Sequence, residues 1–355
     1  MQKIFKNLFI LFISLFLFAG GQLLLSQNND DEKYVVTCIG FYNVENLFDT
    51  INDPEVRDDD FTPEGDNRWN TEKYLEKLEN LAEVIDKMGE ELTPHGPAVL
   101  GLSEVENEDV LKDLAAQERI RDRNYQVVHY HSPDPRGMDV ALMYQPKYFE
   151  VTSTKPVPTE LEREDGSTFR TRDQLLVSGK LLGEPMHFIV LHWPSRRGGE
   201  KRSRPLRIGA AEVARGIVDS LKANDPDAKV IVMGDFNDDP VDISVKEYMK
   251  AKGDKNKLEK GDMYNPFVDF HAKGIGTLAW RDSWNLFDML LLTQPFLDDD
   301  KSSWRYHRAE VFNRPFLRQP SGRFKGYPYR SYGGGVYLGG YSDHFPVYVF
   351  LIKEL

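Results

Sequence analysis

Residues 229–237, Lys-Val-Ile-Val-Met-Gly-Asp-Phe-Asn, join a short apolar run to a polar end. The run is rich in β-branched residues and has the length of a buried strand. Asp235 and Asn237 follow it directly. Such an ending alone is typical of a turn, because Asp and Asn side chains bind neighbouring backbone groups. Its significance therefore depends on whether other strands end in the same way.

Further strand-like segments do end in residues that carry chemistry. A strand that finishes in carboxylates, amides or imidazoles directs them to the rim of its sheet, so several such strands can build one site. Oxygen-rich ligand sets without cysteine favour hard cations such as Mg²⁺, Mn²⁺ or Ca²⁺. Each ending also has a reading as a cap or a turn, but their repetition favours a shared site. The endings are Asn43, Glu104, His192, Asp288 and Ser342-Asp343-His344.

Strands and helices alternate irregularly along the chain. Several neighbouring strands have no helix between them, which predicts mixed or antiparallel sheets. Apolar stripes at helical spacing predict helices over residues 71–88 and 203–221, the second with a Ser203 cap and an early Pro205. No linker or repeat divides the chain, so residues 27–355 are expected to form a single domain. The expected strands are 34–44, 98–105, 125–130, 138–144, 175–182, 186–192, 229–235, 288–292 and 345–352.

Taken as an ordered set, these motifs resemble the endonuclease/exonuclease/phosphatase superfamily, whose fold is that of deoxyribonuclease I. The resemblance spans roughly residues 36–352. It implies an α/β (α+β) fold: a four-layered sandwich in which two mixed β-sheets pack face to face with helices outside. The active site of such a fold lies at one edge of the sheets. The set is highly specific for the superfamily and poorly specific for the substrate.

The resemblance also implies roles for the residues. Glu104 is the principal ligand of a divalent metal ion, with Asn43 and Asp343 as direct or water-mediated ligands. Mg²⁺ is the expected ion, with Mn²⁺ or Ca²⁺ as alternatives, and the number of ions stays open. The implied catalytic residues are Asp235 for the attacking water, Asn237 beside it, the pair Asp288 and His344, and His192 on the phosphate side.

Two acidic residues near these motifs allow more than one interpretation. Asp139 precedes a strand, and it either orients His192 as Asp288 orients His344, or stabilises the turn after Gly137. Glu45 is either a partner of the metal site or an exposed strand terminus.

The evidence on substrate lies mainly after His192. The chain is acidic overall, with a formal net charge of −12, so a polyanion must be met by a local basic patch or by bound metal. Between Arg196 and Arg207 there are six cations and one acid, a pattern typical of a phosphate-backbone contact or of a solvated helix start. Trp280 and Trp284 are candidates for base stacking or for packing. The predicted substrate-binding residues are Arg136, Trp193, Arg196 and Arg197.

The N-terminus is typical of a secretory signal. Lys3 and Lys6 precede an apolar run from Leu8 to Ala19, which is shorter than the roughly 20 residues that a spanning helix needs. Cleavage after residue 26 is expected, with an uncleaved anchor as the alternative. The protein is then exported, periplasmic or secreted. The single cysteine, Cys38, excludes an internal disulfide and is expected to be buried.

These observations predict an exported, divalent-metal-dependent phosphodiesterase. The favoured interpretation is a monomeric, nonspecific nuclease that hydrolyses DNA or RNA. A sphingomyelinase-like phospholipid phosphodiesterase and a small phosphate-ester phosphatase are the alternatives on the same site. A binding module without activity is disfavoured, because no residue of the set is lost.

Overall fold

The computed structural model describes residues 33–163 and 165–355 and contains two large β-sheets. In the first sheet the strand order is β16-β19-β1-β2-β4-β3. β1 runs parallel to β2 and antiparallel to β19, so the sheet is mixed. Its strands are β1 (Tyr34–Leu47), β2 (Val99–Val105), β3 (Gln126–His129), β4 (Asp139–Tyr144), β16 (Arg305–Val311) and β19 (Val347–Glu354).

The second sheet is also mixed, with the order β11-β12-β15-β10-β9-β8-β5. β10 runs parallel to β9 and antiparallel to β15. The strands are β5 (Phe149–Val157), β8 (Gln174–Leu181), β9 (Glu184–His192), β10 (Val230–Asp235), β11 (Ala251–Lys252), β12 (Met263–Tyr264) and β15 (Asp288–Thr293).

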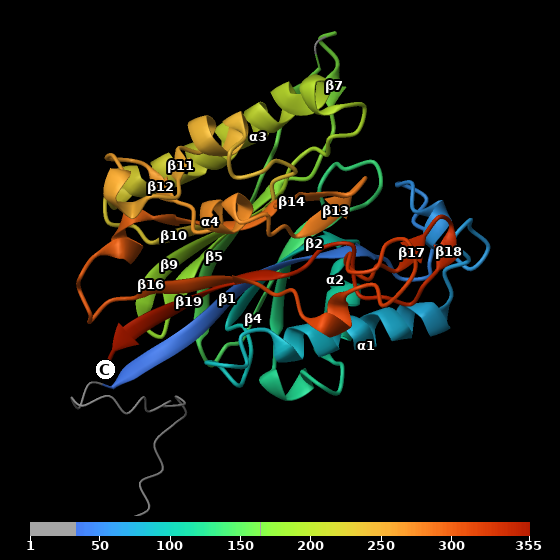
Figure 1. Cartoon of the computed structure of the whole chain (residues 1–355), viewed down its shortest axis with the longest axis horizontal. Helices are drawn as coiled ribbons and strands as arrows, with labels where there is room; N and C mark the ends of the chain where they lie inside the picture. The colour runs from blue at the N-terminus through green and yellow to red at the C-terminus, as the bar shows by residue number, and fades with distance from the viewer. Residues whose placement is uncertain (1–32, 164) are drawn as a thin grey trace, which may run out of the picture.

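The two sheets pack face to face, and helices cover their outer faces (Figure 1). On one side lie α1 (Thr71–Lys87) and α2 (Glu108–Ala115), and on the other α3 (Glu200–Asn224) and α4 (Val268–Ala272). The predicted four-layered sandwich is confirmed. Three short hairpins extend from it: β6 (Leu161–Glu162) with β7 (Thr168–Phe169), β13 (Leu278–Trp280) with β14 (Ser283–Asn285), and β17 (Tyr332–Gly333) with β18 (Val336–Tyr337).

The core lies between the sheets, where apolar side chains of β1, β2, β9, β10, β15 and β19 are fully buried. Gly101 of β2 permits a close approach, because a Cβ there would lie 2.7 Å from Met233 Sδ of β10. Cys38 is buried in β1 as predicted, and burial raises the pKa of its thiol. Burial of both inner faces favours the fold, since apolar area removed from water contributes about 25 cal/mol per Å².

Helix α3 differs from its prediction at the start. It begins at Glu200 after Gly199, and Ser203 lies within its first turn, with its hydroxyl donating to the backbone oxygen of Gly199. Gly199 has φ 109°, a conformation that glycine adopts easily. The prediction that Ser203 caps the helix is therefore wrong: Gly199 is at the cap position, and Ser203 and Pro205 lie inside the helix.

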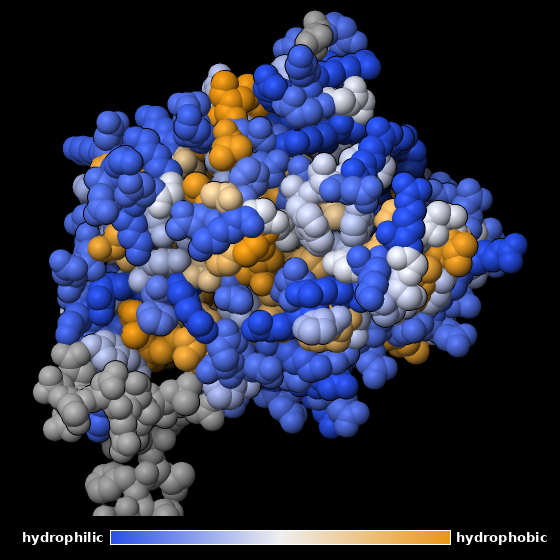
Figure 2. Space-filling model, viewed as in Figure 1, coloured by the Kyte–Doolittle hydropathy of each residue, from blue (hydrophilic) through white to orange (hydrophobic). Residues whose placement is uncertain are grey.

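The predicted signal segment, residues 1–26, lies outside the described residues. Within the described part of the chain, no helix has both the length and the apolar character that crossing a membrane requires. The face shown in Figure 2 is largely hydrophilic, with apolar residues in separate small patches.

Candidate active site

Strand register in the second sheet brings three predicted residues into one row. Asp235, the last residue of β10, pairs with His192 of β9 on one side and with Asp288 of β15 on the other. His192 Nε2 lies 3.5 Å from Asp235 Oδ2. All three side chains are buried. The ends of β9 and β10 and the start of the antiparallel β15 thus meet at the same edge, which no single segment of the sequence could have shown.

Glu104 enters this row from the first sheet because its backbone departs from regular strand geometry. It has φ 63°, and the register of β2 against β4 shifts between Ser103 and Val105, as in a β-bulge. Glu45 and Asn46 of the neighbouring strand also have positive φ, and the Asn46 backbone N–H donates to Glu104 Oε2 at 3.0 Å. Backbone strain of this kind is typical of functional sites, where it fixes the direction of a side chain.

Asn43 connects the two sheets at the site. Its side-chain amide nitrogen lies 3.1 Å from Asp235 Oδ2 and 3.3 Å from Glu104 Oε1, while its oxygen accepts from the Glu45 backbone N–H. Asn43 therefore holds the carboxylate predicted to act on water beside the carboxylate predicted to bind metal.

Asp235 is held by a second asparagine as well. The Asn237 backbone N–H donates to Asp235 Oδ1 at 2.8 Å, and the Asn237 side chain donates to the carbonyl oxygen of Trp193 at 2.9 Å. Burial raises the pKa of Asp235, and the charge of Asp288 adds to this, whereas His344 opposes it. A raised pKa suits a carboxylate that accepts a proton from water.

His344 forms a buried pair with Asp288. His344 Nδ1 lies 2.7 Å from Asp288 Oδ2, and its Nε2 lies 4.0 Å from Asp235 Oδ2. The Ser342 hydroxyl fixes the approach of this segment, since it donates to the carbonyl oxygen of Asn43 and accepts from the His344 backbone N–H. Burial lowers the pKa of His344, but the charge of Asp288 and the hydrogen bond to it outweigh burial and raise the pKa well above its ordinary value.

His192 has the opposite electrostatics. Burial lowers its pKa well below the ordinary value, and the cations Arg172 and Arg136 and then His344 lower it further. Its Nδ1 is buried without a hydrogen-bond partner among the described residues. The two histidines of the site therefore favour different protonation states, the arrangement that acid–base chemistry needs.

The hypothesis that Asp139 orients His192 is wrong. Asp139 instead accepts from the Ser132 backbone N–H, and its Oδ2 lies 2.9 Å from His129 Nε2. The residue that does support His192 is Arg172, whose guanidinium donates to the carbonyl oxygens of His192 and Trp193 and pairs with Asp134 at 2.9 Å. Sequence reasoning missed Arg172, because its partners lie 20 or more positions away.

The donor set fits a hard divalent cation. Carboxylate oxygens of Glu104, Asp235 and Asp343 approach the same edge, and oxygen ligands without thiolate suit Mg²⁺, Mn²⁺ or Ca²⁺. Asn43 turns its amide nitrogen to the carboxylates of Glu104 and Asp235, so in this geometry it positions them and does not offer its oxygen as a ligand. One donor atom each of Asp235, Asp288 and His344 lies within 4.8 Å of the others. Asp343 Oδ2 is held by Arg330 at 2.6 Å, so that arginine also belongs to the site.

Glu45 is not an exposed terminus, and it meets the candidate metal site indirectly, because Arg330 contacts both Glu45 and Asp343. It is 5% exposed, accepts from the Ser331 backbone N–H, and lies 3.3 Å from Arg330 Nε and 4.0 Å from Lys77 Nζ. The buried Lys77 also donates to the Ser331 hydroxyl and to the carbonyl oxygen of Tyr341. This cluster ties the segment before Asp343 to β1 and α1.

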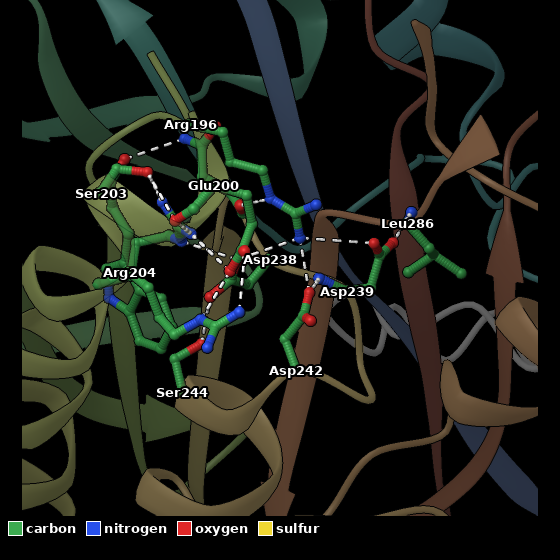
Figure 3. A network of polar contacts seen from close by, with 12 residues as sticks. Arg196, Glu200, Ser203, Arg204, Asp238, Asp239, Asp242, Ser244 and Leu286 are labelled. Carbon is green, nitrogen blue, oxygen red and sulfur yellow. Dashed lines mark hydrogen bonds and ion pairs between the residues drawn. The ribbon is translucent and has the colours of Figure 1, made fainter. Parts of the chain in front are cut away.

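Three of the six cations in the basic run after His192 are paired with acidic side chains, and Figure 3 shows the pairs of Arg196 and Arg204. Arg196 donates to Asp238 Oδ1 at 3.0 Å, Asp242 Oδ2 at 2.5 Å and the carbonyl oxygen of Asn237, and it stacks on Phe287. The prediction that Arg196 binds substrate is not supported, because acids that follow β10 already occupy its guanidinium.

Two further arginines of the run are also engaged. Arg207 is fully buried and its Nε lies 2.7 Å from Asp238 Oδ1, while Arg204 pairs with Glu200. Arg197 and Arg202 instead line a cavity of about 330 Å³ beside the β6–β7 hairpin. These two are the arginines of the run that face open space.

The remaining residues considered for substrate binding also divide into buried and exposed ones. Trp193 is 1% exposed and packs edge-on against Phe236, so its ring is not accessible to a base. Arg136 is partly exposed and lies near His192 on the loop that carries Asp134. Trp280 and Trp284, in contrast, are 64% and 37% exposed on the β13–β14 hairpin.

Comparison with known proteins agrees with this geometry. The model of the endonuclease/exonuclease/phosphatase family matches residues 38–353, and its members typically depend on divalent metal. No curated protein matches the sequence at a significant level.

Solved structures with the same fold share little sequence with this chain. An endonuclease/exonuclease/phosphatase family protein from Bacteroides thetaiotaomicron is 17% identical, covers 92% of this chain and 98% of its own, and has a TM-score of 0.53. The mannosyl-6-phosphatase of Bacteroides thetaiotaomicron is 17% identical (89% and 99% covered, TM-score 0.52). TDP2 of D. rerio, complexed with a single strand DNA product, is 15% identical (89% and 98% covered, TM-score 0.51). The family match over nearly all of the described residues, together with this fold, shows that the chain belongs to the endonuclease/exonuclease/phosphatase family and is a hydrolase acting on phosphoester bonds.

Proposed function

We propose that this protein is an exported, divalent-metal-dependent nuclease that hydrolyses phosphodiester bonds of DNA or RNA without sequence specificity. The observation that carries the proposal is an aromatic ridge next to the candidate active site. We define this ridge by four residues, Trp280, Trp284, Phe324 and Tyr327.

The ridge is exposed, and three of its four rings contact one another. Trp280 and Phe324 are 64% and 52% exposed, the Trp284 ring lies 5.8 Å from that of Tyr327, and Phe324 lies 5.5 Å from the same ring. Cations accompany it, since the guanidinium groups of Arg281 and Arg323 lie over the rings of Trp280 and Phe324. Aromatic faces with interleaved cations are typical of surfaces that bind single-stranded nucleic acid, in which bases stack and phosphates meet positive charge.

The ridge is attached to the catalytic residues. Thr277, just before β13, accepts the Phe345 backbone N–H with its carbonyl oxygen and the Asp288 backbone N–H with its hydroxyl. Trp284 stacks on Phe345 with a centroid distance of 6.0 Å and an interplanar angle of 17°. Phe345 follows His344 directly. A base on the ridge is therefore placed close to the phosphate that would be cleaved.

The residues of the site divide the chemistry of hydrolysis. A divalent cation held by Glu104, with Asn43 and Asp343 beside it, would supply positive charge to the nonbridging oxygens of the phosphate. Asp235, held by Asn43 and Asn237, orients the attacking water and accepts its proton. His344, kept protonated by Asp288, donates a proton to the leaving oxygen. His192, held by Arg172, contacts the phosphate from the opposite side.

A solved structure of the same fold supports the nucleic-acid part of this proposal, and the N-terminal sequence supports the export part. The D. rerio TDP2 complex holds a single strand DNA product on the same fold, which supports it at the level of the fold. Export rests on the N-terminal sequence alone.

A lipid-cleaving activity is the main competitor, since an exposed Trp280 also suits a membrane surface. The tip of its hairpin is Arg281-Asp282, with positive φ at both residues, and this charged turn opposes burial in lipid.

The decisive experiment compares substrates under one condition. The purified protein with Mg²⁺ or Mn²⁺ is incubated with single-stranded DNA, duplex DNA, RNA, sphingomyelin vesicles and mannose 6-phosphate. The proposal requires hydrolysis of a polynucleotide at a higher kcat/KM than that of the lipid or the sugar phosphate. Preferential release of phosphate from mannose 6-phosphate, or of phosphocholine from the vesicles, would replace it with the corresponding alternative.

A further inference from the structure

A second group of metal-ligating side chains lies outside the candidate active site. His129 ends β3, Asp139 begins β4, and His131 lies in the loop between them. His129 Nε2 is 2.9 Å and His131 Nδ1 is 3.4 Å from Asp139 Oδ2. The two imidazole rings are perpendicular, with centroids 5.0 Å apart.

Asp139 is a buried carboxylate with unusual surroundings. Its side chain is 2% exposed, yet in the part of the chain that the structure describes no lysine or arginine forms an ion pair with it. Its other partners are the backbone N–H and the hydroxyl of Ser132. A buried carboxylate is expected to be paired with a cation or bound to a metal ion.

Additional negative charge lies nearby. Burial raises the pKa of Asp173, and the charge of Asp139 is the next cause in the same direction. Asp173 lines a small cavity together with Ser132 and Tyr130, which places it on the same side of the hairpin. A metal cation beside Asp139 would offset this negative charge.

The spacing of the donor atoms matches that of a coordination sphere. Ligands bound at about 2.0–2.1 Å in a tetrahedral arrangement lie roughly 3.3 Å from one another. The distances of 2.9 and 3.4 Å to Asp139 Oδ2 are close to this edge length. One ligand atom each of His129, His131 and Asp139 already lies within 4.8 Å of the others, so the site requires no large movement of the backbone. His131 is 75% exposed, so solvent can complete the coordination.

We propose that His129, His131 and Asp139 bind a borderline transition-metal ion such as Zn²⁺. Two imidazole nitrogens and one carboxylate oxygen are typical ligands of Zn²⁺, Co²⁺ and Ni²⁺, whereas the oxygen donors around Glu104 suit Mg²⁺. The chain thus carries two sites of different chemistry, one for a hard ion and one for a borderline ion.

The position of the second site gives it a structural role. It closes the base of the loop between β3 and β4, and the same loop carries Asp134, which pairs with Arg172 at 2.9 Å. Arg172 in turn holds the carbonyl oxygens of His192 and Trp193. A metal ion at the base of the loop therefore fastens the support of His192 without touching the phosphate.

The experiment uses Co²⁺ as a spectroscopic probe in metal-free protein. Glu104→Gln weakens the candidate catalytic site, so it serves as the background. In this background, one Co²⁺ per chain is expected to bind with the visible absorption of a low-coordinate site with imidazole ligands, and Zn²⁺ is expected to displace it. Adding His131→Ala is expected to abolish both the absorption and the binding. His131 is exposed, so its removal spares the fold.

A control variant tests whether the loss of binding is specific to His131, and the Tm gives a second measure of metal binding. His307→Ala, which removes an exposed histidine on β16, should leave Co²⁺ binding unchanged. Zn²⁺ should raise the Tm of Glu104→Gln but not that of Glu104→Gln/His131→Ala, since an ion that binds only the folded chain stabilises it. Equal Co²⁺ stoichiometry and spectra with and without His131, or no binding in either protein, would overturn the proposal and leave His129 and Asp139 as a hydrogen-bonded staple.

Discussion

His344 Nδ1 lies 2.7 Å from Asp288 Oδ2, although 56 positions separate the two residues in the sequence. Asp288 has its Oδ1 buried without a partner among the described residues, so its hydrogen bonding is directed to this histidine. If Asp288 acts by orienting and charging the ring, its contribution passes through His344.

The losses of kcat/KM caused by removing His344 and Asp288 are therefore not expected to add. His344→Ala and Asp288→Ala should each lower kcat/KM by no more than about 10²–10⁴-fold, the usual scale of general acid–base catalysis. The double variant should resemble His344→Ala. Kinetics on all four proteins, with thermal melts to verify folding, test this. Logarithmic losses that simply add would show that the two side chains act separately.

Trp280→Ala is expected to affect long substrates and spare short ones. Stacking of one base on an aromatic side chain is worth about 1–3 kcal/mol, so KM for an oligonucleotide should rise roughly 5- to 150-fold. Hydrolysis of bis(p-nitrophenyl) phosphate, which does not reach the aromatic ridge, should change little. Leu75→Ala, another exposed apolar residue, is the control and should alter neither substrate. Equal losses of activity on the oligonucleotide and on bis(p-nitrophenyl) phosphate would show that Trp280 supports the fold and does not bind a base.

The arginines after His192 should separate into two classes. Arg197→Gln/Arg202→Gln is expected to reduce the slope of log K against log salt for single-stranded DNA by up to about 1.4, because each phosphate contact contributes about 0.7. Arg196→Met should destabilise the fold by about 1–3 kcal/mol, since Asp242 loses its arginine and Asp238 keeps only Arg207, while the salt slope of the remaining folded protein stays as it was. Salt titrations and urea denaturation measure the two effects. A reduced salt slope in Arg196→Met, with an unchanged slope in Arg197→Gln/Arg202→Gln, would show that Arg196 contacts phosphate and that the other two arginines do not.

Lys77 and Glu45 should behave as a buried pair. Lys77→Met leaves the Glu45 carboxylate buried with only Arg330 as a cationic partner, and removal of one member of such a pair costs about 3–5 kcal/mol. Lys77→Met/Glu45→Gln should recover part of that loss. Lys112→Met, which breaks an exposed pair on α2, should change the free energy of unfolding little. Denaturant curves decide between these outcomes, and a small effect of Lys77→Met would contradict the role of the cluster.

The fold was predictable because its signals are local. Apolar runs such as 229–235 and the alternation of strands and helices predicted mixed or antiparallel sheets, and the family resemblance implied two mixed sheets packed face to face. The structure and the comparisons confirm that architecture. The structure also gathers Asn43, Glu104, His192, Asp235, Asp288 and His344 at one sheet edge, as the ordered strand endings indicated. Their catalytic roles stay predictions.

What the sequence left open depends on contacts between distant segments. In the sequence Arg196 has no visible partner, and only the fold brings Asp238 to its guanidinium. In the same way, the sequence does not show that Trp193 is buried and Trp280 exposed. Arg172 and Arg330 carry no motif, and their importance arises from the groups that they meet across the fold. Pairing of this kind depends on tertiary structure, which strand periodicity does not encode.

The proposed function requires a divalent ion at Glu104 that drives phosphodiester hydrolysis of nucleic acid. The most direct measurement is cleavage of a labelled single-stranded oligonucleotide by wild type and by Glu104→Gln, each titrated with Mg²⁺ and with excess chelator. Glu108→Gln, an exposed glutamate on α2, is the matched control. Wild type and Glu108→Gln are expected to cleave the oligonucleotide only with metal and to lose this activity in chelator. Glu104→Gln is expected to show nearly no cleavage at any Mg²⁺ concentration. Cleavage in excess chelator, or Glu104→Gln within a few-fold of wild type, would contradict the proposed function.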